Sequence, residues 1–326
     1  MKKISVAVLY GGRSGEHEIS VRSAESVKGA LNRDRYNVSE IFISREGVWK
    51  PKPISPEPDS NPEIDVVFPV LHGTFGEDGT VQGLLELADL PYVGAGVMAS
   101  AVSMDKAVMK RLCQEAGLPV VEHVVLDQGK LDDNKAAVPF AFPVFVKPAN
   151  LGSSVGISKV KCAEELAQAI AVASKYDRKV VIERGIHGRE FECAVLGGHP
   201  ARAAVPCEIL PSREFYDYQD KYLLDKAVID LPAKLTADET AEIQRLAVAC
   251  FHTVGCEGMA RVDFLMEAAS GTFYINEINT IPGFTSISMY PKMWEYSGMS
   301  YPELLDRLIE LAFERAQTRR SMQYTR

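Results

Sequence analysis

The sequence predicts a mixed α/β and α+β protein whose N-terminal part is a doubly wound parallel sheet. The nearly continuous apolar segment 4–9 ends at Gly11-Gly12, and apolar residues then recur at helical spacing as far as Leu31. The same order of buried strand, glycine turn and helix recurs over 65–71 and about 80–89. Repeated units of this kind build parallel sheets, because each helix carries the chain back across the sheet.

The middle of the chain predicts a smaller α+β domain. An apolar helical stripe begins near residue 103 and is closed by Gly117. Strands are expected over 142–147, 157–160 and 179–183, and the apolar spacing between the last two predicts a helix.

The last part also predicts strands and helices in an α+β arrangement. Strands are expected near 190–196 and 201–210, and two more flank the turn at Ser270-Gly271. Capping-box spacing at Thr236–Glu239 and again at Ser300–Glu303 marks the starts of two amphipathic helices.

Length and composition limit the possible classes of protein. The 326 residues suggest roughly two domains at about 150 residues each. The net charge of −8 gives no electrostatic reason to bind nucleic acid or an anionic membrane. The first apolar stretch is too short for a signal peptide, and no segment approaches the ~18 apolar residues of a membrane helix. We therefore expect a soluble, cytoplasmic protein.

A glycine- and serine-rich loop follows a lysine at the end of a predicted strand. The segment runs from Lys147 through Gly152-Ser153-Ser154 to Gly156. Backbone N–H groups of such a loop can surround phosphate oxygens, and the lysine supplies a positive charge. The alternative interpretation is an ordinary hairpin with a flexible turn, which the loop alone would favour.

A second pattern places two carboxylates on one hairpin. If the strands pair symmetrically about Ser270, Asp263 lies opposite Glu277 and Arg261 lies opposite Asn279, all on one face. Two carboxylates and an amide oxygen are hard ligands suited to Mg²⁺ that also holds phosphates. The alternative is an exposed polar face on which Arg261 pairs with Asp263.

Two further segments allow a functional and a structural interpretation. Glu16 lies in the loop before the first helix, where it could bind a substrate amine or only stabilise the helix start. The aromatic and charged segment 215–222 could be a lid or a packed surface loop.

The segment Gly94-Ala95-Gly96-Val97-Met98-Ala99 matches the dinucleotide-binding pattern. It does not follow the first strand, where that pattern belongs, so close packing or a chance match is favoured. A nicotinamide-dependent oxidoreductase remains the alternative from another functional class.

In combination, these motifs resemble the D-alanine–D-alanine ligase family of the ATP-grasp superfamily. The resemblance runs from about Ile4 to Leu311, and its specificity comes from the order of the motifs. The matching motifs are the loop from Gly11 to Ser20, His72-Gly73 with Gly76-Glu77-Asp78-Gly79, Lys147-Pro148 with Gly152 to Gly156, and Asn276-Glu277 through Asn279-Thr280 with Pro282-Gly283.

The resemblance implies a three-domain ATP-grasp architecture, with expected domains 1–102 for substrate binding, 103–187 as a lid and 188–326 for ATP, Mg²⁺ and catalysis. It implies that ATP phosphorylates one D-alanine to an acyl phosphate, which the amine of a second D-alanine attacks, for peptidoglycan precursor synthesis. The implied cofactors are ATP and two Mg²⁺ or Mn²⁺, and the implied assembly is a homodimer.

The resemblance also implies an ATP site between the central and C-terminal domains. Lys106 and Lys147 would contact the phosphates, and the loop Ser153, Ser154 and Val155 would close over them. Residues expected near the adenine and ribose are Glu183, Arg184, Ile186, Glu190 and Phe215. The implied metal ligands are Asp263, Glu277 and Asn279, in agreement with the hairpin argument.

The implied substrate site adjoins the ATP site. Glu16 would bind the first ammonium group in a triad with Ser153 and Tyr222, with His72 nearby. The oxyanion would be stabilised by Arg261 and the Gly283 N–H, and the second carboxylate would be bound by Ser288, Met289 and Lys221. Tyr222 resembles dipeptide-forming members, which favours D-alanine over D-lactate as second substrate; D-lactate or D-serine remains the alternative.

Overall fold

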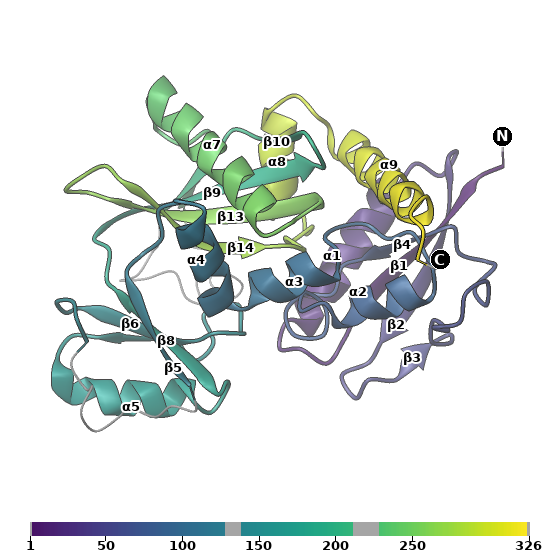
Figure 1. Ribbon diagram of the computed structural model, residues 1–326. Coiled ribbons are helices and arrows are strands. Elements are labelled where there is room, and N and C mark those ends of the chain that lie inside the picture. The colour runs from purple at the N-terminus through teal and green to yellow at the C-terminus, as the bar shows by residue number, and fades with distance from the viewer. Residues whose placement is uncertain (1, 128–137, 211–227, 325–326) are drawn as a thin grey trace.

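The computed structural model describes residues 2–127, 138–210 and 228–324. Within these residues the strands form three sheets, which follow one another along the chain (Figure 1). The family resemblance predicts this mixture of a parallel-sheet region and two α+β regions, and the sheet topology confirms the fold class.

The first sheet has the order β3-β2-β1-β4. Strand β1 is parallel to both β2 and β4, as the strand–turn–helix repeats predict, whereas β3 is antiparallel to β2. The strands are β1 (Ile4–Gly11), β2 (Tyr36–Ile43), β3 (Trp49–Lys50) and β4 (Val66–Pro69). The edge strand β3 was not predicted, because two residues show no periodicity.

Helices cover both faces of this sheet. Val6 and Val8 pack on the face covered by α1 (His17–Ala30) and α9 (Tyr301–Arg320), and the alternate residues Ala7 and Leu9 pack on the other face. That second face is covered by α2 (Thr80–Leu87). Both faces of β1 are therefore buried, which explains why its sequence is apolar without alternation.

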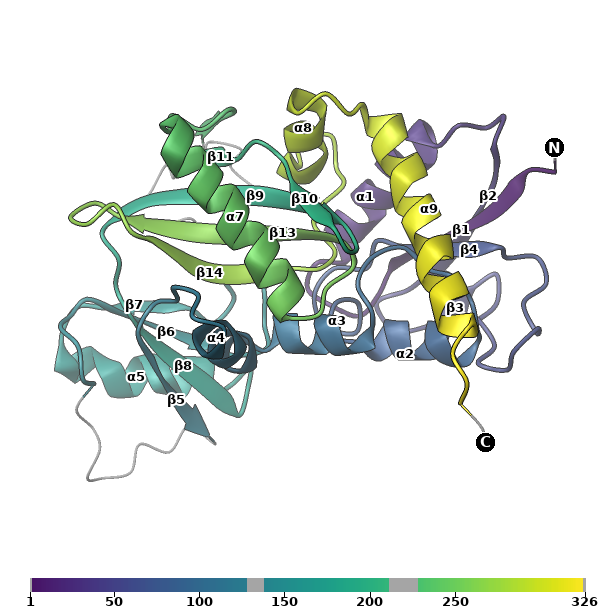
Figure 2. The same cartoon turned by 45° about the horizontal axis from the view of Figure 1, so that its top comes forward.

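The central sheet is antiparallel, with the order β5-β8-β6-β7. Its elements are α4 (Lys106–Glu115), β5 (His123–Asp127), β6 (Val144–Pro148), β7 (Ser158–Val160), α5 (Ala163–Ala173) and β8 (Lys179–Arg184). Helix α5 packs on one face and α4 on the other (Figure 2). The strand β5 was not predicted from the sequence.

The third sheet is antiparallel and has the order β12-β11-β9-β13-β14, with β10 paired to β9. Its elements are β9 (Gly188–Gly197), β10 (Ala201–Ala203), β11 (Cys207–Leu210), β12 (Val228–Asp230), α7 (Ala237–Thr253), β13 (Gly258–Glu267), β14 (Phe273–Asn279) and α8 (Met289–Tyr296). Helix α7 covers one face (Figure 2). Both predicted capping boxes are present, at the starts of α7 and α9.

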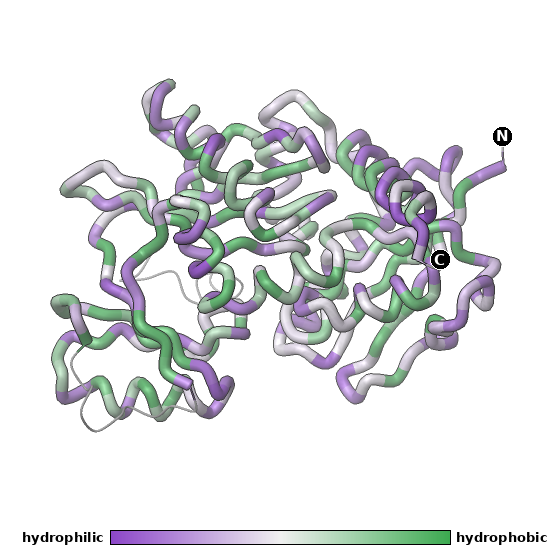
Figure 3. Tube along the Cα trace, viewed as in Figure 1, coloured by the Kyte–Doolittle hydropathy of each residue, from purple (hydrophilic) through white to green (hydrophobic). Residues whose placement is uncertain are grey.

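One apolar cluster joins the first and third sheets. It contains Val6 and Val8 of β1 together with Met259 of β13, Trp294 of α8 and Leu308 of α9, each 2% exposed or less. The apolar segments lie along the strands and on the inner sides of the helices (Figure 3). Among the described residues, no helix has the length and apolar character needed to cross a membrane.

The glycine pattern lies immediately before α3 (Val97–Met104), beside the start of β13. A Cβ atom at Gly258 would lie 3.0 Å from the carbonyl oxygen of Gly94, so the two backbones touch where β13 begins. The guanidinium of Arg315 donates to the carbonyl oxygens of Gly94 and Tyr92. The close approach explains the glycine at position 258, whereas Gly94 has a φ of +96°, a conformation that favours glycine.

We expect Leu308→Ala to lower the free energy of unfolding by about 2–5 kcal/mol, because Leu308 is fully buried in the shared apolar cluster. Urea denaturation would measure the loss. Leu87→Ala is the matched control, since Leu87 is 66% exposed and its truncation should change stability by less than about 0.5 kcal/mol. Equal effects of the two substitutions would contradict the shared core.

Candidate active site

The hairpin of β13 and β14 has the predicted register at its polar end. Asp263 pairs with Glu277, and Arg261 pairs with Asn279. Nearer the turn the register shifts by one residue, since Phe264 pairs with Ile275. The additional residue in β14 is Asn276, and this bulge allows both Asn276 and Glu277 to line the same cavity.

Arg261 is the centre of a buried charge network. Its Nε and Nη2 atoms each donate to one oxygen of Asp263 at 2.7 Å, and Glu192 lies 3.3 Å away. The amide nitrogen of Asn279 donates to Asp263 Oδ2 at 3.0 Å. Burial opposes the charge, but Asp263 and Glu192 hold the pKa of Arg261 well above its ordinary value. The Arg261–Asp263 pair of the alternative interpretation is thus present, but on a buried face, because Asp263 is only 3% exposed.

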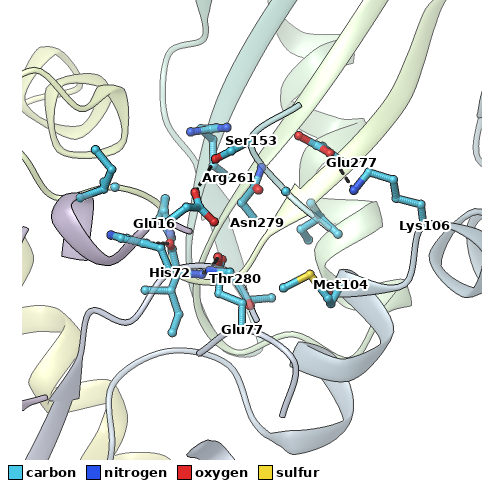
Figure 4. A pocket seen from close by; sticks show the side chains of 18 residues that line it. Glu16, His72, Glu77, Met104, Lys106, Ser153, Arg261, Glu277, Asn279 and Thr280 are labelled. Carbon is cyan, nitrogen blue, oxygen red and sulfur yellow. Dashed lines mark hydrogen bonds and ion pairs between the residues drawn. The ribbon is translucent and has the colours of Figure 1, made fainter. Parts of the chain in front are cut away.

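Glu16 connects the first and central sheets across the site (Figure 4). It is the N-cap residue of α1, and its Oε1 atom accepts a hydrogen bond from Ser153 Oγ at 2.5 Å. Gly73 leaves space for this carboxylate, since a Cβ atom there would lie 2.5 Å from Glu16 Oε2. Glu16 and Ser153 therefore face each other, as the resemblance predicts.

His72 links the N-terminal part to the loop after β14. Its Nδ1 atom lies 3.0 Å from the carbonyl oxygen of Ile281 and its Nε2 atom 3.0 Å from Ser23 Oγ. Since a carbonyl can only accept, Nδ1 carries the proton and Nε2 accepts from Ser23. Burial lowers the pKa of His72, and this favours the neutral ring.

Glu77 makes a second link between the same two regions, and sequence analysis assigned no role to it. Its two carboxyl oxygens accept hydrogen bonds from Gly73 N–H at 2.8 Å and Ile281 N–H at 3.0 Å. Burial, followed by the charge of Glu16, raises the pKa of Glu77 to about 8. The motif Gly76-Glu77-Asp78-Gly79 was the available signal, but the burial of its carboxyl depends on tertiary contacts.

Lysines from two elements reach the region between the central and third sheets. Lys106 Nζ donates to the carbonyl oxygen of Leu151 at 2.8 Å and lies 3.3 Å from Glu277 (Figure 4). Lys147 Nζ lies 2.6 Å from Glu183 and donates to Asn276 Oδ1 at 3.3 Å. Both predicted phosphate-binding lysines therefore lie beside β14.

Two adjacent cavities share four lining residues: Lys106, Gly152, Ser153 and Glu277. The smaller cavity has a volume of about 70 Å³, and the larger has about 270 Å³. Predicted site residues that line the smaller cavity are Glu16, His72, Lys106, Ser153, Arg261, Glu277, Asn279 and Gly283. Those that line the larger cavity are Lys106, Lys147, Ser153, Ser154, Glu183, Arg184, Ile186, Glu190 and Glu277.

Some predicted residues lie elsewhere. Asp263 lines neither cavity and contacts Arg261 and Asn279. Val155, Ser288 and Met289 also line neither cavity. The hydroxyl of Ser288 lies next to Gly283, since a Cβ atom there would be 2.6 Å from Ser288 Oγ. The side chain of Met289 packs in the apolar core. The predictions for Phe215, Lys221 and Tyr222 lie outside the described residues.

Several lining residues were not predicted. In the smaller cavity they include Met104, Glu77 and Thr280, and in the larger one Arg189, Glu208 and Asn276. Arg189 and Glu208 form a two-point ion pair at 2.7 and 2.6 Å between neighbouring strands. Nothing in the sequence pattern signals that pair, because its two residues are 19 positions apart.

Asp263, Glu277 and Asn279 of the β13–β14 hairpin carry oxygen donors of the kind that a hard divalent cation prefers. Asp263 and Glu277 lie directly opposite each other, and two like charges in this position need neutralisation. Asn279 donates through its amide nitrogen, which leaves its oxygen as a possible ligand. Among the described residues, no three His, Cys, Asp or Glu side chains converge for a metal. A cation here would therefore also need oxygens from a bound substrate.

The pKa of Glu77 predicts a pH effect on stability. Between its ordinary pKa of 4.5 and about 8, the folded protein keeps a proton that the unfolded chain releases. Relative to Glu77→Gln, the wild type should therefore lose unfolding free energy as the pH rises from 5 to 8, by at most about 1.4 kcal/mol per pH unit. Urea denaturation across this range would measure both proteins, and parallel stability curves would contradict the assignment.

Comparisons with known proteins identify the family of this chain. Residues 112–310 match the family model described as "D-ala D-ala ligase C-terminus", and residues 5–61 and 51–95 match "D-ala D-ala ligase N-terminus". The chain is 60% identical to a D-alanine–D-alanine ligase of Solibacter usitatus, over 99% of this chain and 100% of that protein. It is 48% identical to a ligase of the same name from Thermoanaerobacter sp. strain X514, over 96% and 98% of the two chains.

Solved structures of D-alanine ligases are also similar to this chain. The D-alanine–D-alanine ligase of Coxiella burnetii has a TM-score of 0.86 at 38% identity, over 98% of this chain and 97% of that one. The VanG D-Ala:D-Ser ligase of Enterococcus faecalis has a TM-score of 0.88 at 35% identity, over 95% and 100%. The match to both family models and the 60% identity over the full length show that this chain belongs to the D-alanine–D-alanine ligase family.

Proposed function

We propose that this enzyme joins two D-alanine molecules in an ATP-dependent reaction that supplies D-alanyl-D-alanine for peptidoglycan precursors. The observation that carries the proposal is the junction of the two cavities at Lys106, Ser153 and Glu277. A nucleotide in the larger cavity would direct its terminal phosphate toward an amino acid in the smaller one. Family membership supports a ligase over a nicotinamide-dependent oxidoreductase.

The reaction needs two bond-forming steps. In the first, a carboxylate oxygen of one D-alanine attacks the γ-phosphorus of ATP, and ADP leaves. In the second, the amine of another D-alanine attacks the resulting acyl phosphate, loses a proton, and inorganic phosphate leaves from the tetrahedral intermediate. Phosphoryl transfer depends mainly on position and charge stabilisation, which lysines and a divalent cation provide.

The residues around the smaller cavity support roles in substrate binding. The carboxylate of Glu16, held by Ser153, would bind the ammonium group of the first D-alanine. Arg261 and the Gly283 N–H would stabilise the oxyanion of the second step, and His72 would fix the loop that carries Gly283 through its bond to Ile281.

The residues around the larger cavity support ATP binding. Lys106 and Lys147 would contact the phosphates, with Ser153, Ser154 and Val155 in the loop above them. Ser153 and Ser154 have φ values of 53° and 59°, a left-handed conformation that often occurs where a loop clamps a ligand. Residues proposed near adenine and ribose are Glu183, Arg184, Ile186, Glu190 and Phe215.

Asp263, Glu277 and Asn279 would hold two Mg²⁺ or Mn²⁺. When bound, the cations would neutralise charge on the phosphate oxygens. Asp263 and Glu277 also form ion pairs with Arg261 and Lys106.

We also propose the division into domains 1–102, 103–187 and 188–326, each centred on one of the three sheets. The protein is proposed to be cytoplasmic and to form a homodimer. Light scattering, which measures the molar mass in solution, is the direct test of the homodimer. Ser288 and Lys221 are proposed to bind the carboxylate of the second D-alanine together with the backbone N–H of Met289, whose side chain packs in the apolar core. Tyr222 is proposed to complete the group of Glu16 and Ser153.

Phosphate release is the test of the activity. With ATP, Mg²⁺ and D-alanine, we expect phosphate release well above the rate without D-alanine, and L-alanine should not replace it. D-serine and D-lactate, each with D-alanine, test the second substrate, since VanG is named a D-Ala:D-Ser ligase. Folded protein that releases no phosphate above the background rate would contradict the proposal.

We expect Glu277→Gln to lower the rate of phosphate release by at least about 100-fold, because it removes a charge at the proposed metal site and the partner of Lys106. Glu295→Gln is a suitable control, because this exposed residue is outside both cavities. Wild-type activity in Glu277→Gln would refute the metal assignment.

A further inference from the structure

A fully buried lysine lies behind the larger cavity. Lys110, in α4, has 0% exposure and lies 3.1 Å from Glu183 Oε1. The other oxygen of Glu183 lies 2.6 Å from Lys147 Nζ. Lys147 and Glu183 line the cavity, whereas Lys110 does not, so the carboxylate separates two ammonium groups.

The charges that line the larger cavity balance one another in the described part of the chain. Four basic residues, Lys106, Lys147, Arg184 and Arg189, face four acidic ones, Glu183, Glu190, Glu208 and Glu277. The formal charges of these lining side chains therefore sum to zero. Lys110 adds one positive charge directly behind the cavity.

The geometry also indicates how this charge acts. Without Lys110, Glu183 and Lys147 would form a neutral pair at 2.6 Å, and the carboxylate would compete with a phosphate for Lys147. With Lys110 on its other oxygen, the carboxylate is shared between two ammonium groups. Burial raises the pKa of Glu183, but Lys110 and Lys147 lower it to about 2, so it stays ionised.

A purely structural role is the competing explanation. Ala107 of α4 packs against Val181 of β8, so the ion pair of Lys110 with Glu183 could only fasten the helix to the sheet. Burial itself lowers the pKa of Lys110, while Glu183 opposes this effect. The two explanations differ in whether the charge of Lys110 acts on a ligand.

We propose that Lys110 is a positioning residue for the triphosphate, which offsets Glu183 and thereby keeps the charge of Lys147 available to the phosphates. This inference rests on the proposed use of ATP. Lys110 needs no contact with the nucleotide, because its effect passes through Glu183.

The test compares ATP binding, by isothermal titration calorimetry with Mg²⁺, among four proteins. Lys110→Met removes the charge and should weaken ATP binding by about tenfold. Lys110→Met combined with Glu183→Gln removes one charge of each sign. Because Glu183 is also proposed to lie near the adenine, recovery is measured with inorganic triphosphate and Mg²⁺, which Lys110→Met should bind more weakly and the double variant nearly as tightly as wild type. Arg111→Met, the matched control, removes an exposed charge from the next position of α4 and should bind like wild type.

Adenosine binding and steady-state kinetics provide two further measurements. Adenosine lacks phosphates, so the affinity of Lys110→Met for it should match wild type. The KM for ATP should rise in this variant more than kcat falls. Equal affinity of Lys110→Met and wild type for ATP, or no recovery in the double variant, would overturn the inference.

The outcomes also separate this inference from the proposed function. A wild-type protein that does not bind ATP contradicts the proposed function itself, whereas ATP binding that is insensitive to Lys110 contradicts only the inference. If Lys110→Met does not fold, the single variant Glu183→Gln is used in its place. Because Glu183 is also proposed to lie near the adenine, this variant is tested with inorganic triphosphate and Mg²⁺ in place of ATP. It should bind inorganic triphosphate at least as tightly as wild type, and weaker binding would overturn the inference.

Discussion

The pairing of β13 with β14 is the interaction on which the rest of the site depends. It places Arg261 opposite Asn279 and Asp263 opposite Glu277, on the face of the sheet away from α7. A slip of one residue would turn these side chains into the apolar core beneath α7 and bring Val262 to the site. The apolar residues that alternate with them therefore fix the position of the polar ones.

Charge balance is the second constraint on this site. Arg261 with Asp263 and Glu192, Lys106 with Glu277, and Lys147 with Glu183 and Lys110 each bring opposite charges together. Buried charges are stable only when they are paired, and the pairs also hold each cation in place before a ligand arrives. The overall charge of −8 thus coexists with a site in which each of these lysines and arginines lies beside a carboxylate.

Much of this arrangement follows from the sequence, and the exceptions have physical reasons. The pair of Asp263 with Glu277 was predicted from symmetric pairing about Ser270. The pairing nearer the turn, Phe264 with Ile275, would by itself place Asp263 opposite Asn276, so the predicted pair also needs the bulge. The bulge itself was not predicted, although the buried residues Ile275 and Ile278 are three positions apart instead of two, which marks an additional residue in the strand. The burial of Lys110 could not be predicted, because in the sequence it is one of several charged residues of an amphipathic helix. Its burial results from the packing of α4 on β8.

The most direct test of the proposed mechanism follows one oxygen atom. D-alanine labelled with ¹⁸O in its carboxylate would be incubated with ATP, Mg²⁺ and the enzyme, and the released phosphate would be analysed by mass spectrometry. Because the carboxylate oxygen becomes the bridge of the acyl phosphate and leaves with phosphorus, each released phosphate should contain one labelled oxygen. Formation of D-alanyl-D-alanine with unlabelled phosphate would contradict an acyl phosphate intermediate.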